Sequence, residues 1–86
     1  MPIIATFFGI VIRMFYRGHE PAHFHAEYQG QQAKFDLAGN LIIGSIRSKT
    51  AVGLIGQWAS LHRTELEANW KRIKAGEALE RIEPLD

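Results

Sequence analysis

A short stretch of the chain, from His19 to Glu27, concentrates the side chains best suited to chemistry. It holds three of the four histidines of the protein, together with two glutamates. Neutral imidazoles and carboxylates are common ligands of divalent transition metals, and histidine is the usual acid–base catalyst near neutral pH. This stretch is therefore the first candidate for a functional site.

Residues 23 to 28 alternate between polar and apolar types. The apolar members of this alternation, which share one face of an extended chain, are Phe24, Ala26 and Tyr28. The polar members, which share the other face, are His23, His25 and Glu27. A period of two predicts a half-buried β-strand that turns its histidines toward solvent.

The next segment, residues 31 to 37, alternates in the same way and predicts a second strand. If Gln29 and Gly30 form a two-residue hairpin loop, the apolar residues of the two strands match across the pair. The same register places His25 opposite Lys34 and His23 opposite Asp36.

This arrangement leads to a first functional hypothesis, a divalent-metal site. Its candidate ligands, which converge if the turn before the strand folds back, are His19, His23, His25, Glu27 and Asp36. Two histidines and a carboxylate on one face match a facial triad for a transition metal, which would be the only cofactor implied. The alternative is structural: the same residues can be the polar outer face of a two-stranded pair.

A second hypothesis is metal-independent cleavage of RNA by acid–base catalysis, with His23, His25 and Lys34 as the candidate catalytic residues. Histidine can move the proton and lysine can stabilise the developing charge on phosphorus. Asp36 would fix the tautomer of His23, and arginines 13 and 17 would position the phosphate. The sequence contains no recognisable nucleophile motif or glycine-rich phosphate loop, so the enzyme assignment stays open.

The composition indicates one soluble domain. The chain has 86 residues, of which 47% are hydrophobic, and it has no cysteine, which excludes disulfides and thiolate-ligated metal sites. The formal net charge of +1 does not indicate a nucleic-acid partner. No stretch is long enough to span a membrane, and Arg13 interrupts the apolar start, so we expect a cytoplasmic protein.

We expect residues 1–86 to form a single α+β domain. Residues 1–47 predict an antiparallel sheet of three to four strands, which is packed by one or two C-terminal helices within residues 48–76, and residues 77–86 predict an extended tail. Residues 3–8 and 10–16 form either one bulged strand or two short ones. The segment 41–46 is apolar on both sides, which favours a central strand.

The helical half carries an apolar stripe with a spacing of three or four residues from Val52 to Ile73. Ser48 is the expected N-cap of a helix that starts near Lys49. We expect a break near residues 62–64, where Thr64 would cap a second helix. One unbroken helix that serves a homodimer is the alternative, since a dimer interface would help so small a domain.

Several segments resemble a known family of small bacterial proteins. The matching segments are residues 7–12, 19–28 with its His-Phe-His core, 58–63, 69–70 and 82–85. The family is called domain of unknown function 4160, and a common form of it has a second proline where this chain has Ala22. The resemblance implies no particular activity or ligand set. It implies a protein partner encoded by a neighbouring gene, in a toxin–antitoxin-like or regulatory pair.

From the residues and this resemblance together, we expect an interaction module that uses the histidine-bearing strand face as its working surface. A divalent-metal-binding protein and a metal-independent ribonuclease are the alternatives.

Overall fold

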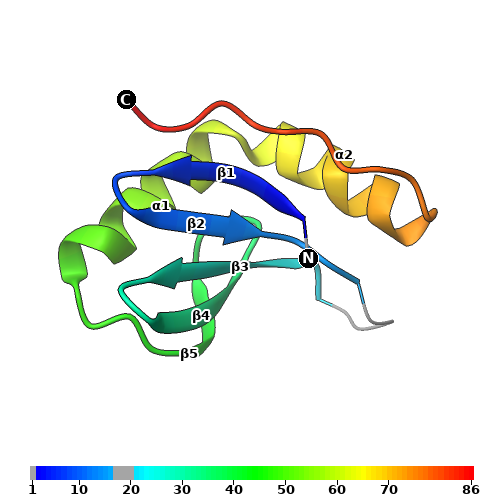
Figure 1. The fold of residues 1–86 in the computed structure, drawn as a ribbon. Coiled ribbons are helices and arrows are strands. Elements are labelled where there is room, and N and C mark those ends of the chain that lie inside the picture. The colour runs from blue at the N-terminus through cyan, green and yellow to red at the C-terminus, as the bar shows by residue number, and fades with distance from the viewer. Residues whose placement is uncertain (1, 17–20) are drawn as a thin grey trace.

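The fold, seen in a computed structural model that describes residues 2–16 and 21–86, confirms the α+β class. One five-stranded antiparallel sheet runs in the order β1-β2-β3-β4-β5, and two helices follow it (Figure 1). The strands are β1 (Ile3–Phe7), β2 (Ile10–Arg13), β3 (His23–Tyr28), β4 (Gln31–Asp36) and β5 (Leu41–Gly44). The helices are α1 (Lys49–Leu61) and α2 (Arg63–Lys74).

The first two strands are joined by a tight turn, which is why the sheet has five strands instead of three or four. Phe8 and Gly9 have φ angles of 50° and 78°. Two consecutive positive φ values are the signature of the type I′ turn that fits the twist of a β-hairpin. The alternative of two short N-terminal strands is therefore the one that holds.

The predicted hairpin between β3 and β4 is confirmed residue by residue. Gln29 and Gly30 form its loop, with φ angles of 49° and 77°. Phe24 lies opposite Phe35, and His25 lies opposite Lys34. The stacked rings of Phe24 and Phe35, 5.6 Å apart, fix this register because a shift by one residue would turn both rings away from the core.

The core lies between one face of the sheet and the two helices. Trp58 of α1 is fully buried, and its ring lies 5.7 Å from that of Phe24 and 5.5 Å from that of Phe7. Leu66 from α2 is also fully buried. The helices thus cover one face of the sheet, while β2, β3 and β4 carry half-exposed side chains on the other.

The helical half breaks where expected, but its cap is different. Ser48 caps α1 by accepting a hydrogen bond from the backbone N–H of Ala51, as predicted. The N-cap of α2 is His62, and not Thr64. The Nδ1 of His62 donates to the carboxylate of Glu65 at 2.8 Å. The backbone N–H of His62 donates to the carbonyls of Trp58 and Ala59 at the C-terminal end of α1. His62 is thus both the C-cap of α1 and the N-cap of α2.

The C-terminal tail contacts the β1 edge of the sheet at Ile4. The backbone N–H of Ile82 donates to the carbonyl of Ile4 at 2.8 Å, and the indole N–H of Trp58 donates to the carbonyl of Glu83 at 2.8 Å. Figure 1 shows this red segment running back along the sheet beside β1. Residues 77–86 contain no helix or strand.

The position of β5 corrects a prediction. The segment 41–46 was expected to be central because it is apolar on both sides, yet β5 is the last strand of the meander and lies at an edge. All four of its residues are exposed. The chain leaves β5 for α1, so no later segment comes back to pair with it among the described residues.

Within the described residues, neither α1 nor α2 has the length and apolar character that a membrane-spanning helix needs.

Candidate functional site

His23 does not face solvent, which corrects the predicted histidine surface. Its side chain is only 5% exposed, and the indole of Trp70 lies over it with ring centroids 5.1 Å apart. The Nδ1 of His23 lies 2.9 Å from the carbonyl oxygen of Pro21. Since a carbonyl can only accept, Nδ1 carries the proton. The end of α2 thus covers the start of β3, and His23 has a structural position.

Asp36 lies opposite His23 in the register, as predicted, but its carboxylate binds elsewhere. It accepts hydrogen bonds from the backbone N–H groups of Ala38 and Asn40, both at 2.9 Å, and from the side chain of Asn40 at 3.2 Å. Partial burial raises the pKa of Asp36, but these hydrogen bonds and the charge of Arg63 outweigh it and lower the pKa overall. Asp36 therefore stabilises the turn after β4 instead of orienting His23.

His25, Glu27, Lys34 and Arg13, the other predicted residues that the structure describes, lie on the open face of the sheet. His25 stacks on the ring of Phe15 at 4.3 Å, and Arg13 lies 3.7 Å from the carboxylate of Glu27. A hollow of about 160 Å³ lies between these side chains. His25 has two cross-strand neighbours, Lys34 on β4 and Arg13 on β2. Two of the predicted catalytic residues, His25 and Lys34, are therefore adjacent.

The predicted metal ligands that lie within the described residues do not converge on one point. Among residues 2–16 and 21–86, no group of three or more His, Cys, Asp or Glu side chains could hold a metal ion. Asp36 is occupied by its own turn, and His23 is turned under Trp70. His19, the fifth candidate ligand, and Arg17, the second predicted phosphate-binding arginine, lie outside the described residues.

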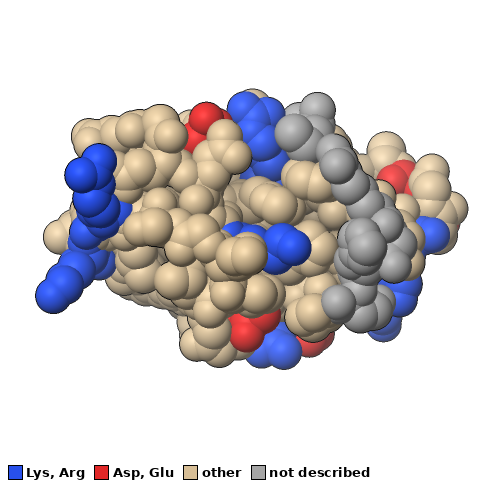
Figure 2. Space-filling view, turned by 90° about the horizontal axis from the view of Figure 1, so that it is seen from below, with Lys and Arg blue, Asp and Glu red and all other residues tan. Residues whose placement is uncertain are grey.

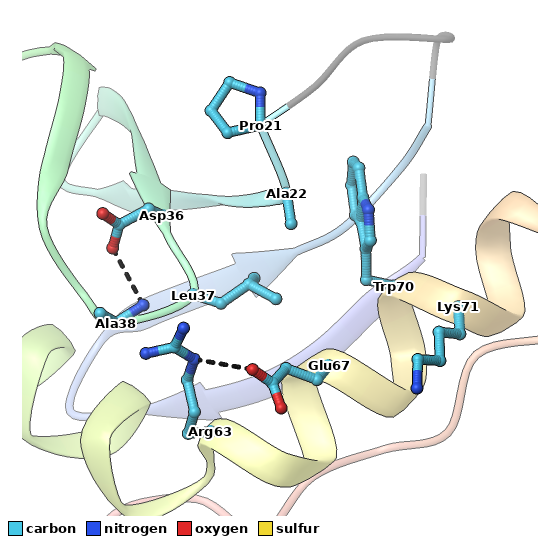
Figure 3. Close-up of a pocket in the computed structure, with 9 residues that line it drawn as sticks. All are labelled: Pro21, Ala22, Asp36, Leu37, Ala38, Arg63, Glu67, Trp70 and Lys71. Carbon is cyan, nitrogen blue, oxygen red and sulfur yellow. Dashed lines mark hydrogen bonds and ion pairs between the residues drawn. The ribbon is translucent and has the colours of Figure 1, made fainter.

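A cleft of about 510 Å³ lies between α2 and the adjoining ends of β3 and β4. We call it the α2 cleft. Nine residues line it, and Figure 3 shows them: Pro21, Ala22, Asp36, Leu37, Ala38, Arg63, Glu67, Trp70 and Lys71. His23 lies behind this wall, because it contacts both Trp70 and the backbone of Pro21. The histidine motif thus supports the cleft without lining it.

The α2 cleft combines apolar and charged lining. Leu37 and Trp70 supply buried apolar surface. Arg63 is paired with Glu67 across one turn of α2, at 3.2 Å, as the dashed line in Figure 3 shows. Lys71, one turn further on, has no carboxylate within ion-pair distance in the described part of the chain. The cleft can therefore accept an apolar group beside an anionic one.

Of the residues that line the α2 cleft, only Asp36 was predicted from the sequence to belong to a functional site. Trp70 is a buried residue of α2, and Lys71 is an exposed residue of its last turns. Trp70 and Lys71 lie near the turn after β4 because α2 packs across the end of the sheet. The local sequence pattern of neither segment indicates that they are close in space.

Comparison with known proteins identifies one relationship. The family model described as "Domain of unknown function (DUF4160)" matches residues 9–71, a range that includes every residue lining the α2 cleft. No curated protein matches the chain. No solved structure matches it either.

Proposed function

The chain belongs to the DUF4160 family, and from that premise we propose that it is a protein-interaction module that takes a segment of a small partner protein into the α2 cleft. The partner would be encoded by a neighbouring gene, in a toxin–antitoxin-like or regulatory pair. The observation that carries this proposal is the cleft itself: a hollow of about 510 Å³ that is lined by Leu37 and Trp70 and has the cation of Lys71 at its rim.

The lining indicates the chemistry of the bound segment. Trp70 and Leu37 suit an apolar side chain, since aromatic and aliphatic surface supplies most of the energy of such anchors. Lys71 suits a carboxylate next to that anchor. Glu67 is already paired with Arg63, and Figure 3 shows the carboxylate of Asp36 on the opposite side of the cleft from Lys71, so the position beside Lys71 can take an acidic residue. The expected segment therefore has an apolar residue flanked by aspartate or glutamate.

The test is coexpression with the product of the neighbouring gene, followed by gel filtration and titration calorimetry. Two substitutions address the cleft. Ala38→Tyr places a ring at its mouth, and Lys71→Glu reverses the charge at its rim. We expect each to weaken the complex by about ten-fold or more, because hot-spot contacts of this kind are concentrated in a few residues.

Matched controls separate the cleft from general surface effects. Ala78 and Lys49 are exposed like Ala38 and Lys71 but do not line the α2 cleft. Ala78→Tyr and Lys49→Glu should therefore bind the partner as the wild type does. Separate elution of the two wild-type proteins at about 10 μM overturns the proposed function, since a specific complex of this size is expected to persist there. If all four variants bind the partner equally strongly, the α2 cleft is not the binding site.

A metal-independent ribonuclease is a second candidate, favoured by one observation. Arg13, His25 and Lys34 are consecutive cross-strand neighbours on the open sheet face, so a proton carrier lies between two cations. Incubation of RNA with the pure protein in EDTA should then give cleavage that His25→Ala and Lys34→Ala abolish and Lys49→Ala preserves. If the wild type leaves RNA intact at every pH tested, this candidate is withdrawn.

A further inference from the structure

Strand β5 is an exposed edge with the composition of a buried strand. Leu41, Ile42 and Ile43 are 52%, 43% and 64% exposed. Leu41 lies opposite Phe35 on the helix face of the sheet, and Ile43 lies opposite Lys34 on the open face. The apolar surface therefore continues on both sides of an edge whose outward N–H and C=O groups have no strand partner among the described residues. Natural proteins usually protect such edges with charges, prolines or covering segments.

The two edges of the sheet are treated differently. The β1 edge is covered by the protein's own tail, through the hydrogen bond from Ile82 to Ile4. The β5 edge carries no charged residue between Asn40 and Ile46 and no proline. Figure 2 looks at the molecule from below and shows mainly uncharged atoms, with basic side chains scattered between them.

From this asymmetry we infer that β5 pairs with β5 of a second copy of the chain, in an antiparallel arrangement around a two-fold axis. A sheet with two open edges would pair head to tail and grow into filaments, because that contact does not close. Here the tail already lies against the β1 edge at Ile4, so β5 is the edge that a second copy would meet, and pairing of β5 with β5 gives a closed contact. The product is a closed dimer with a continuous ten-stranded sheet, five strands from each copy.

Charge permits this self-pairing. Around a two-fold axis, a residue near the axis lies beside the same residue of the second copy, so charged residues there would repel each other. Residues 40 to 46 are all uncharged, so the two strands meet without that penalty. Pairing would also give Leu41 and Ile43 apolar neighbours on the two faces of the extended sheet, which is the environment that their sequence pattern predicts.

The strand is short, which sets the strength of the dimer. Four residues from each copy bury less than the roughly 1,200 Å² typical of stable complexes, so we expect a reversible dimer with a dissociation constant of about 10 to 100 μM. This surface is separate from the α2 cleft. The inference therefore goes beyond the proposed function and does not depend on it.

The experiment is sedimentation velocity on the full chain across a concentration series up to about 500 μM, well above the expected dissociation constant. Ile43→Lys places two like charges near the axis, and Leu61→Lys is its matched control, because Leu61 is 65% exposed but lies at the end of α1. We expect the wild type and Leu61→Lys to dimerise and Ile43→Lys to remain monomeric.

Hydrogen exchange gives a second, direct readout. The amides of residues 41–44 should exchange more slowly as the concentration of the wild type rises, while those of Ile43→Lys should not change. Ile43→Lys is at an exposed position, and its circular dichroism spectrum checks that it is folded. A wild type that stays monomeric throughout the series, or a dimer that Ile43→Lys leaves intact, overturns the inference. Ala38→Tyr should dimerise normally, so failure here and failure of the cleft are distinguishable.

Discussion

The imidazole of His23 and the indole of Trp70 lie with their ring centroids 5.1 Å apart and their planes inclined by 57°. This contact joins the first residue of β3 to the second half of α2 and closes one end of the core. It explains why the most conspicuous histidine of the sequence is buried, and it holds one wall of the α2 cleft in place.

Replacement of His23 by alanine should destabilise the protein. The substitution removes a buried ring that contacts Trp70 and His25, and it leaves the carbonyl of Pro21 without its donor. We expect a loss of about 2 to 3 kcal/mol in the free energy of unfolding, measured by urea denaturation. Lys34→Ala, on the open face of the adjacent strand, should cost about 0.5 kcal/mol or less. Equal stability of the two variants would show that His23 has no supporting role.

Asn69 should prove essential for holding the C-terminal tail. It is fully buried, its amide donates to the carbonyl of Glu80 at 2.8 Å, and its Oδ1 accepts from the backbone N–H of the same residue at 3.0 Å. Asn69→Ala leaves both backbone groups without partners, which should cost about 2 to 4 kcal/mol.

Limited proteolysis provides the measurement for Asn69. Trypsin should cleave after Arg81 much faster in Asn69→Ala than in the wild type, because the tail is then released from β1. Ala68→Ser, a neighbouring change that leaves the hydrogen bonds of Asn69 in place, serves as the control. Cleavage at the same rate in all three proteins would contradict the role given to Asn69.

Asp36 should make the stability depend on pH in the acid range. Its pKa in the folded state lies below the usual value, so its contribution is complete above that usual value and is lost as the pH falls through the lowered one. Asp36→Asn should therefore be less stable than the wild type by about 1 to 2 kcal/mol at neutral pH.

The difference between wild type and Asp36→Asn should shrink as the pH falls through the lowered pKa of Asp36, because the carboxyl group then becomes protonated in the folded as well as in the unfolded chain. Urea denaturation at several pH values measures it. Asn40→Ala, which removes one of the donors to Asp36, should reproduce part of the effect. A difference that stays constant with pH would contradict this account.

Substitution of Gly53 by alanine should stabilise the protein. Gly53 lies inside α1, and a Cβ atom there would meet nothing within 4 Å. Alanine has a higher helix propensity than glycine, so we expect a gain of about 0.5 to 1 kcal/mol, seen as a higher melting temperature.

Gly44→Ala is the contrasting control for Gly53→Ala. Gly44 has a φ of 92°, and a Cβ atom there would lie 2.6 Å from the carbonyl oxygen of Gln32. Alanine at this position must displace backbone of β4, so the melting temperature should fall. Destabilisation by both substitutions would show that α1 is not regular around residue 53.

The sequence alone determined what depends on neighbouring residues. The period of two placed Phe24 and Phe35 in register across β3 and β4, because only one alignment buries both rings. The Gln29–Gly30 loop, the Ser48 cap and the break at residue 62 follow from local backbone preferences in the same way. These features need no knowledge of distant segments.

Tertiary structure decided which surfaces remain accessible. Alternation gives the face on which His23 lies, but burial of that residue depends on Trp70, which arrives from a helix much later in the chain. In the same way, the apolar pattern of β5 is that of a strand with neighbours on both sides, and only the order of the strands in the sheet leaves it at an edge. Hydrophobic patterning is local, whereas solvent exposure is set by packing between segments far apart in the sequence. The α2 cleft and the β5 edge therefore became visible only in the folded molecule.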